Sequence, residues 1–356
     1  MKKIITVVGA RPQFIKAATL SRQFQLLGIE ELIIHTGQHF DANMSNVFFE
    51  EMEIPKPAYQ LDIHGLSHGA MTGRMLEGIE TVLLKEKPDA VMIYGDTNST
   101  LAGALAASKL HIPVIHVEAG LRSYNMKMPE EINRILTDRI SNVLFCPTDT
   151  AINNLKREGY ENMPVKIIKN GDVMQDAALY YAAKAEEKSE ILKQNNLDNF
   201  VLATVHRQEN TDSIDNLSNI VAGLNEINKE IPVVVPIHPR TRQILSKNNI
   251  VPEFKLIDPV GYFDMIMLLK SCFLAITDSG GVQKEAFFFQ KHCITLREQT
   301  EWVELVENGF NILVGSDKQK LMSAFNYFKT KKSNFDINLY GNGKAAEIAA
   351  KEIMSL

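Results

Sequence analysis

The sequence has little cysteine: Cys146, Cys272 and Cys293 are the only three, and they lie far apart. This spacing indicates neither a C-x-x-C metal site nor a disulfide framework. Such sparse cysteine is typical of a reducing compartment, so we predict a cytoplasmic protein without a bound metal.

A long hydrophobic run is also missing. No stretch is long and apolar enough to span a bilayer. The start, Met1-Lys2-Lys3 followed by the apolar residues 4–8, has some features of a signal peptide. The apolar run is too short for one, however, and Arg11-Pro12 interrupts it. We therefore predict a buried first strand at residues 4–8 and no membrane partner.

Neither sign of charge dominates. The net charge is -5, from 38 basic and 43 acidic residues. This balance gives no reason to expect nucleic acid or an anionic membrane as a partner. If the substrate is an anion, the positive charge that binds it must be local.

What the sequence does contain is typical of a globular α/β protein. Its 45% apolar residues are ordinary, and its 356 residues suggest two domains. Apolar runs rich in valine and isoleucine alternate with amphipathic stretches such as 71–85 and 100–109. The runs predict strands at 4–8, 31–35, 90–94, 114–117, 143–146, 200–205, 233–237, 255–257, 274–277 and 292–295. Because these runs hardly alternate with polar residues, we predict parallel sheets that helices cover on both faces.

The strand pattern stops and then restarts after a polar, helix-favouring piece at 182–199. We predict an N-terminal Rossmann-like domain at 1–170 and a second at 171–343. Residues 344–356 read as a helix that packs back on the first domain. Ligands of such folds bind beyond the carboxyl ends of the strands, so we expect a central cleft between the domains.

The first strand ends in Gly9-Ala10-Arg11-Pro12-Gln13, and a helix containing Lys16 follows. Proline is favoured at a helix start, and the free amides there can bind an anion. A plain turn with a surface arginine explains the pattern equally well. The segment is not G-x-G-x-x-G, so it does not support a nicotinamide or flavin site.

A second turn predicts a phosphate site more sharply. The strand 274–277 runs into Asp278-Ser279-Gly280-Gly281, which opens a helix at 282–289. Two glycines and a serine at a helix start offer amides and a hydroxyl to phosphate. Glu285, about one turn later, is in reach of a sugar hydroxyl. The alternative is a capping turn without a ligand.

Three carboxylates follow strands or open a helix on the first sheet: Asp96, Glu118 and Glu130, with Arg134 spaced to pair with Glu130. Each alone is explained by a cap or an ion pair. Together, at the carboxyl side of one sheet, they indicate proton transfer at carbon, which needs groups that remove and return a proton.

Two histidines end strands of the second half. His206-Arg207 follows residues 200–205, and His238-Pro239-Arg240 follows residues 233–237. One such histidine would be structural. Two, each near an arginine, favour a role in holding a diphosphate or in acid catalysis.

Taken together, the motifs resemble the non-hydrolysing UDP-N-acetylglucosamine 2-epimerase family over essentially the whole chain. The matching segments are 9–12 with Lys16, 36–39, 95–97, 116–122, 129–134, 206–210, 238–239 and 278–285. The resemblance implies two Rossmann-like domains of the B-type glycosyltransferase kind. It also implies a homodimer and no metal or redox cofactor.

The family's chemistry, implied by this resemblance, removes the proton at carbon 2 and expels UDP to leave a glycal. UDP then adds back as a proton arrives on the opposite face. The implied catalytic residues are Asp96, Glu118, Glu130, Arg134 and His206. The implied UDP-binding residues are Arg11, Lys16, His206, His238, Ser279, Gly280, Gly281 and Glu285.

Two segments depart from the usual family pattern. The opening has Ala10 and Gln13 where threonine and glutamate are usual, and residues 300–304 read Thr-Glu-Trp-Val-Glu in place of Thr-Glu-Arg-Pro-Glu. With residues 38–44, 61–65 and 283–289, these changes resemble the branch that acts on UDP-2,3-diacetamido-2,3-dideoxy-glucuronate. That branch makes the manno epimer for surface polysaccharides such as lipopolysaccharide. UDP-N-acetylglucosamine remains the alternative substrate.

The resemblance also marks Gln38 and His39 as candidates for a regulatory site, because some family members bind substrate as an activator near this loop. Three rival functions stay open. A B-type UDP-sugar glycosyltransferase would need an acceptor and a single base, and a hydrolysing epimerase would release free sugar. A nucleotide-sugar sensor would bind UDP without proton exchange.

Overall fold

The computed structural model describes residues 2–38 and 53–355. The chain forms two compact units. Unit 1 comprises residues 1–177 and 338–356, and unit 2 comprises residues 178–337. The boundary between them falls within helix α7 (Val173–Lys188).

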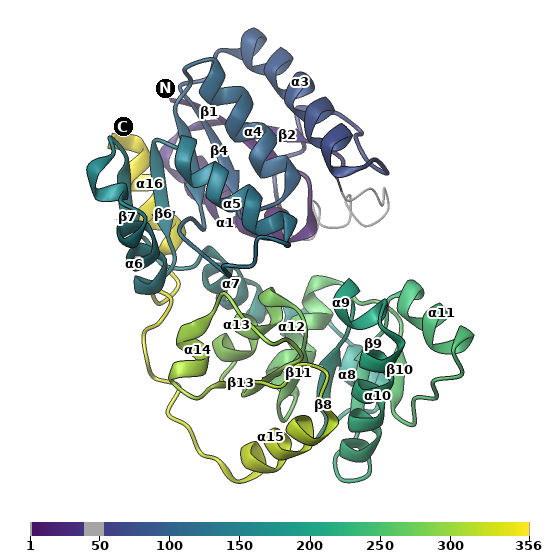
Figure 1. The fold of residues 1–356 in the computed structure, drawn as a ribbon. Coiled ribbons are helices and arrows are strands. Elements are labelled where there is room, and N and C mark those ends of the chain that lie inside the picture. The colour runs from purple at the N-terminus through teal and green to yellow at the C-terminus, as the bar shows by residue number, and fades with distance from the viewer. Residues whose placement is uncertain (1, 39–52, 356) are drawn as a thin grey trace. The chain divides into compact units, whose positions relative to one another are not determined.

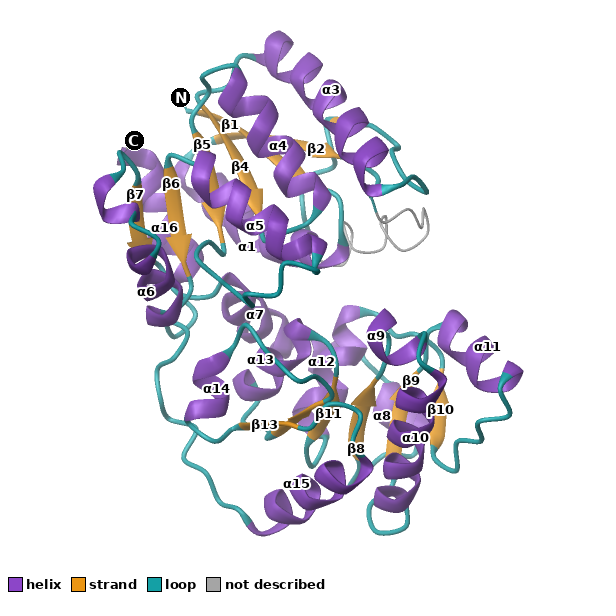
Figure 2. Cartoon of the chain, in the orientation of Figure 1, coloured by secondary structure: helices purple, strands orange, loops and turns teal. Residues whose placement is uncertain are grey.

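Unit 1 is built on one parallel sheet, coloured orange in Figure 2, with the strand order β3-β2-β1-β4-β5-β6-β7. Its strands are β1 (Lys3–Val8), β2 (Glu30–His35), β3 (Tyr59–Gln60), β4 (Ala90–Tyr94), β5 (Val114–Val117), β6 (Val143–Cys146) and β7 (Lys166–Lys169). Its helices, besides the start of α7, are α1 (Arg11–Leu27), α3 (His68–Glu86), α4 (Asn98–Lys109), α5 (Pro129–Ile140), α6 (Asp149–Arg157), the short η1 (Tyr160–Asn162) and α16 (Ala345–Ser355).

Helices α3 and α4 cover one face of the unit 1 sheet. Met75 and Ile79 of α3 pack in one apolar core with Ile5 and Val7 of β1. Gly103 lets α4 come close, because a Cβ there would lie only 3.0 Å from Ile93 Cγ2 and 3.2 Å from Val7 Cγ2. The central strands covered in this way are mostly apolar, as expected of a sheet that is buried on both faces.

The last helix returns to the first unit. α16, yellow in Figure 1, packs beside α1. Gly171 and Gly341 meet where the chain leaves unit 1 and comes back, and both have positive φ, +92° and +97°. A Cβ at Gly171 would lie 2.6 Å from Tyr340 O, so the approach requires glycine.

Unit 2 is a second parallel sheet with the order β10-β9-β8-β11-β12-β13. Its strands are β8 (Val201–Thr204), β9 (Val233–Pro236), β10 (Lys255–Ile257), β11 (Ala275–Thr277), β12 (Cys293–Thr295) and β13 (Asn311–Leu313). Its helices, after the end of α7, are α8 (Ile191–Asn195), α9 (Gln208–Thr211), α10 (Ile214–Asn228), α11 (Pro239–Lys247), α12 (Tyr262–Ser271), α13 (Gly280–Phe288), α14 (Val303–Glu307) and α15 (Lys318–Thr330).

Strand β8 shows how unit 2 buries both faces of its sheet. Val201 and Ala203 face a core that includes residues of α10 and α15. Leu202, which points the other way, joins residues of α8, α12 and α13. Successive side chains of the strand point to opposite faces of the sheet, and each face packs against an apolar core. This explains why polar and apolar residues do not alternate along β8.

The predicted α/β class with two parallel sheets is confirmed. All ten predicted strands match within one residue at each end, and 90–94, 114–117, 143–146 and 255–257 match at both ends. The prediction missed β3, β7 and β13, all of which are edge strands. Within residues 2–38 and 53–355, no helix has the length and apolar character needed to cross a membrane.

Candidate active site

Both sheets reverse their strand order at a point where polar side chains gather. In unit 1 the reversal lies between β1 and β4, and in unit 2 between β8 and β11. Helices leave opposite faces of the sheet at such a point, which opens space for a ligand beyond the carboxyl ends of the strands. Arg11 and Asp96 follow the two strands in unit 1, and His206 and Ser279 follow the two in unit 2.

Asp96 forms a salt bridge with Arg134 of α5. Arg134 also pairs with Glu131, at 3.1 Å from Nη1 to Oε2. Glu131 is fully buried and accepts hydrogen bonds from the amides of Ser123 and Tyr124, at 2.9 and 2.8 Å, as well as from Ser123 Oγ. The buried carboxylate of Glu131 therefore holds Arg134 in place. The Asp96 side chain, its other partner, is 30% exposed.

Glu118 directly follows β5 and has an unusual backbone conformation. Its φ is +71°, in the left-handed region that non-glycine residues seldom adopt. Its amide donates to Phe145 O at 3.1 Å, and its carboxylate pairs with Lys16 of α1. Strain of this kind concentrates at functional sites, where surrounding contacts hold it in place.

Lys16 lies between Glu118 and the backbone next to Asp96. A Cβ placed on Gly95 would lie 3.2 Å from Lys16 Nζ, so the ammonium sits against the backbone beside Asp96 while it pairs with Glu118. The structure thus brings Asp96, Glu118, Lys16 and Arg134 to one edge of one sheet. Each of the two carboxylates there is paired with a cation.

Glu130 lies apart from these pairs. It is exposed in the first turn of α5, after Pro129, where an acidic side chain also suits the helix dipole. The pair with Arg134 predicted from the i, i+4 spacing is wrong, because Arg134 instead pairs with Asp96 and with Glu131 at i, i-3.

The turn between β1 and α1 is tightly packed. A Cβ on Gly9 would lie 2.0 Å from Thr36 Oγ1 and 2.2 Å from Ser99 Oγ, so only glycine fits. Arg11 is the first residue of α1, and its side chain lies outside what the structure describes. Gln38 reaches the start of α4, where its Oε1 accepts from Ser99 N at 3.0 Å and from Ser99 Oγ at 2.7 Å. His39 lies outside the described residues.

In unit 2 a buried aspartate organises the turn that carries His206. The Asp278 carboxylate accepts from the amides of His206 and Arg207, each at 3.0 Å, and from Asn210 Nδ2 at 3.1 Å. His206 Nδ1 lies 3.2 Å from Asp278 Oδ1. A carboxylate beside Nδ1 keeps the proton on that nitrogen, and the imidazole side chain remains 52% exposed.

The turn after β11 opens helix α13. Ser279 caps α13, with its Oγ accepting from Val282 N at 3.5 Å. A Cβ on Gly280 would lie 2.4 Å from Glu301 Oε1, so the Glu301 side chain packs closely against this glycine. A Cβ on Gly281 would have only Ser279 Oγ near it, at 3.9 Å, which leaves open space at the helix start. Glu285 is buried further along the same helix.

His238 also starts a helix. It is exposed at the N-cap of α11, and its Nδ1 accepts from Arg240 N at 3.2 Å. This bond requires an unprotonated Nδ1, so the neutral ring carries its proton on Nε2.

Sequence reasoning assigned no role to three buried residues of the unit 1 site: Gln13, Asn133 and Glu131. Gln13 stood out only as a departure from the family pattern, and Glu131 is the neighbour of a residue that was singled out. Only the fold shows which of two adjacent acids faces inward, because position on the helix sets the direction of each side chain.

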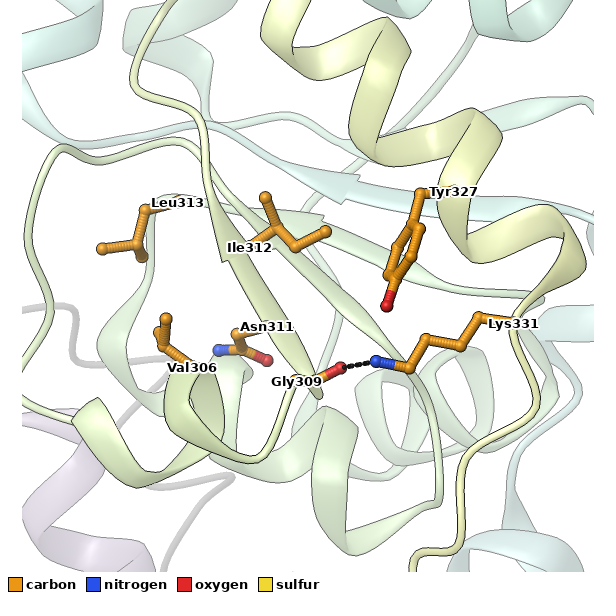
Figure 3. Close-up of a pocket in the computed structure, with 7 residues that line it drawn as sticks. All are labelled: Val306, Gly309, Asn311, Ile312, Leu313, Tyr327 and Lys331. Carbon is orange, nitrogen blue, oxygen red and sulfur yellow. Dashed lines mark hydrogen bonds between the residues drawn. The ribbon is translucent and has the colours of Figure 1, made fainter.

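Two further features do not belong to this site. A groove of about 470 Å³ lies between β13 and α15, lined by residues including Ile312, Tyr327 and Lys331 (Figure 3). Lys331 Nζ donates there to Gly309 O at 2.8 Å. No predicted site residue lines this groove. In the part of the chain that the structure describes, no cluster of three or more His, Cys, Asp or Glu side chains could hold a metal ion.

Comparisons with known proteins identify the family of this chain. The profile of the family described as UDP-N-acetylglucosamine 2-epimerase matches residues 25–354. A UDP-2,3-diacetamido-2,3-dideoxy-D-glucuronate 2-epimerase of Pseudomonas aeruginosa is 56% identical over 356 residues, which cover 99% of this chain and 100% of the relative. A UDP-N-acetylglucosamine 2-epimerase of Methanocaldococcus jannaschii is 46% identical over 357 residues, or 97% of each chain.

Solved structures agree with the sequence matches. The Methanocaldococcus jannaschii UDP-GlcNAc 2-epimerase in complex with UDP-GlcNAc and UDP superposes with a TM-score of 0.92 at 46% identity, covering 100% of both chains. The Neisseria meningitidis UDP-GlcNAc 2-epimerase bound to UDP-GlcNAc gives 0.87 at 30% identity, covering 99% of this chain and 100% of that one. The expected B-type glycosyltransferase kind of fold is therefore confirmed. On these matches, which run almost from end to end, the chain belongs to the UDP-N-acetylglucosamine 2-epimerase family.

Proposed function

We propose that this protein inverts carbon 2 of UDP-2,3-diacetamido-2,3-dideoxy-glucuronate and gives the manno epimer without hydrolysis. The reaction would break the C2–H bond and the C1–O bond to UDP. The electron pair of the C–H bond forms the C1=C2 double bond of a glycal, and the pair of the C–O bond leaves with UDP. UDP then adds back to carbon 1, and a proton adds to carbon 2 on the face opposite to the one that lost it. The electrons balance, so no redox cofactor is needed.

The observation that carries this proposal is the cluster of Asp96, Glu118, Lys16 and Arg134. Proton removal on one face and proton delivery on the other require two acid/base groups near one carbon. Asp96 and Glu118 follow neighbouring strands, and each is paired with its own cation. We assign them as the acid/base pair. Glu130, exposed nearby in sequence on α5, is the third candidate.

Departure of the diphosphate requires hydrogen-bond donors, whose bonds become stronger as negative charge develops on the leaving oxygen. The amides at Ser279, Gly280 and Gly281 and the half-exposed His206 are suited to this role. Arg11 and His238 would add charge, and Glu285 would hold the ribose. A hydrogen bond from His206 to a leaving oxygen suits its geometry, because Asp278 orients the ring from Nδ1.

The choice of sugar is supported by the relative from Pseudomonas aeruginosa, whose name states the diacetamido-glucuronate and which shares 56% of its residues with this chain. The relatives named for UDP-N-acetylglucosamine are more distant, for example 46% for the Methanocaldococcus jannaschii enzyme. UDP-N-acetylglucosamine is the second candidate substrate.

Proton NMR in deuterated buffer separates these candidates. We expect the diacetamido-glucuronate nucleotide to gain deuterium at carbon 2 and to yield the manno product, and UDP-N-acetylglucosamine to stay unchanged. Turnover of UDP-N-acetylglucosamine alone would support the same reaction, with UDP-N-acetylglucosamine as its substrate. Transfer of sugar to an acceptor, or release of free sugar, would replace the proposal by a glycosyltransferase or a hydrolysing epimerase.

Assembly and cellular role form part of the same proposal. By family resemblance the protein would act as a homodimer in the cytoplasm and supply a sugar for surface polysaccharide, including lipopolysaccharide. Light scattering tests the dimer: a mass near 80 kDa is expected, twice the 40.0 kDa of one chain. A mass of one chain at micromolar concentration would contradict it.

A further inference from the structure

Three consecutive backbone carbonyls around Asp96 are each bound by a buried side chain. Tyr94 O accepts from Gln13 Nε2 at 2.9 Å, and Gly95 O accepts from His116 Nε2 at 2.7 Å. Asp96 O accepts from Asn133 Nδ2 at 2.9 Å. The three donors come from α1, β5 and α5. We call Gln13, His116 and Asn133 the carbonyl clamp.

All three members of the clamp are shielded from water. Gln13 is 1% exposed, His116 0% and Asn133 6%. Hydrogen bonds in such an environment are stronger than at a surface, and a lost partner leaves a buried polar group unpaired. The clamp is therefore a rigid feature of unit 1.

The orientation of Gln13 is fixed by its other contacts. Its Oε1 accepts from Gly9 N at 2.8 Å and from Ala10 N at 3.0 Å. The amide nitrogen must therefore be the atom that faces Tyr94 O. Asn133 is oriented in a similar way, since its Nδ2 also approaches Asn98 Oδ1 at 3.2 Å.

His116 has an acceptor at each ring nitrogen. Nδ1 lies 2.7 Å from Asp138 Oδ1, and Nε2 lies 2.7 Å from Gly95 O. A carboxylate and a carbonyl can only accept, so both bonds form only when both nitrogens carry protons. The geometry therefore requires an imidazolium at this position.

The surroundings of His116 balance this positive charge. Asp138 also accepts from Arg122 Nη1 at 2.7 Å, and Arg122 donates from Nε and Nη2 to Glu158 at 2.7 and 2.8 Å. Burial alone would raise the pKa of Asp138, but the bonds from His116 and Arg122 outweigh it and lower that pKa. Two anions and two cations thus alternate from Glu158 to His116.

The clamp acts on a turn that contains a glycine, and it adds to the bond from Gly95 N to Val117 O at 3.0 Å. Gly95 has φ of +63°, and glycine places few limits of its own on the backbone. We propose that Gln13, His116 and Asn133 are positioning residues, which fix the backbone of Asp96 so that its carboxylate meets carbon 2, with His116 donating to Gly95 O. This inference rests on the proposed function, because it assumes that Asp96 transfers the proton.

Two substitutions of His116 separate the clamp bond from general packing. Glutamine can place its amide near the Nε2 position and keep the bond to Gly95 O. Asparagine can place its amide near Nδ1 and keep only the bond to Asp138. Both variants lose one hydrogen bond and the charge, so their losses of stability should be similar.

We expect H116N to lower kcat for carbon 2 exchange by about 10–100-fold, because small misplacements of a reacting group have effects of this size. H116Q should lower kcat at least tenfold less than H116N. KM and the Kd for UDP should stay within about twofold in both, since neither substitution replaces a residue assigned to UDP binding. Equal kcat in the two variants, or losses confined to KM or to thermal stability, would overturn the inference.

Asn133 provides a second test that does not depend on H116N folding. N133A should lower kcat about tenfold with KM unchanged. Ser141→Ala is the matched control, because Ser141 Oγ also donates to a carbonyl, Thr137 O at 2.7 Å, at the other end of the same helix. Wild-type kcat in N133A, or an equal loss in S141A, would contradict the clamp.

The charge of His116 can be read in the wild-type protein. With ¹⁵N-labelled histidine, both ring nitrogens of His116 should show the shifts of protonated nitrogen at neutral pH. An unprotonated nitrogen would remove the bond to Gly95 O and overturn this part of the inference. Absence of carbon 2 exchange in the wild type would instead refute the proposed function, so the two failures are distinguishable.

Discussion

At the scale of single residues, the site combines strain with charge pairing. Glu118 holds a φ of +71° at the end of a buried strand, a conformation that costs roughly 1–2 kcal/mol for a residue with a side chain. Its pairing with Lys16 and the bond from its amide to Phe145 O hold it there. The backbone strain thus aims a carboxylate that an ordinary strand end would direct elsewhere.

Asp96→Asn and Glu118→Gln test the acid/base assignment. Each amide keeps the shape of the side chain but cannot take up a proton, so kcat should fall by roughly 10²–10⁴-fold with the Kd for UDP unchanged. Asp89→Asn is a matched control, because Asp89 accepts from Lys3 N at 2.7 Å at the opposite end of the sheet. Near-normal kcat in both D96N and E118Q would refute the assignment.

Ser279→Ala tests the predicted phosphate turn. If its hydroxyl meets the diphosphate, UDP binding should weaken by about 1–3 kcal/mol by calorimetry. Loss of the cap on α13 should also cost about 1 kcal/mol of stability. Ser213→Ala separates the two effects, since Ser213 caps α10 with a bond of 3.3 Å from Asn216 N. An unchanged Kd for UDP in S279A would show that the hydroxyl caps α13 and does not contact the diphosphate.

At the scale of elements, the sequence predicted central strands well and edge strands poorly. Residues 90–94 form a continuous apolar run, and residues 114–117 are apolar except for His116. Helices bury both faces of these strands, and the sequence pattern detects them directly. β7 reads Lys-Ile-Ile-Lys, and β3 is only two residues long. Such strands are set by pairing with a neighbour that lies far away in the sequence, which a local pattern does not contain.

The attachment of α16 to unit 1 should depend on pH. Asp176 of α7 accepts from Ala345 N at 3.1 Å and Ala346 N at 2.8 Å, at the start of α16. Burial raises the pKa of Asp176 to about 6, and the charge of Asp172 adds to the rise. A carboxyl pKa raised on folding favours the folded state at low pH, and this contribution is lost as pH rises through about 6.

Asp176→Asn removes this titration and keeps an acceptor for the helix amides. We expect the wild-type protein to lose thermal stability relative to D176N as pH rises from 4 to 7. Melting curves of both proteins across this range measure the difference. A difference that does not change with pH would show that Asp176 does not titrate as its burial predicts.

At the scale of the whole molecule, the prediction of two α/β units carried most of the functional information. The carboxyl ends of parallel strands lie at one edge of each sheet, so residues such as Asp96 and Glu118 could be grouped from sequence. The partners within each group could not be predicted. Arg134 was expected to pair with Glu130 and pairs with Asp96 and Glu131, because α5 is placed by packing that joins distant segments.

The central claim is that the bond between carbon 1 and UDP breaks and re-forms at each inversion. The most direct measurement places ¹⁸O in that bridging position and follows the β-phosphorus by ³¹P NMR during turnover. We predict that the label spreads to the non-bridging oxygens of the β-phosphate at a rate comparable to deuterium entry at carbon 2. Epimerisation with the label fixed in the bridge would contradict elimination and re-addition.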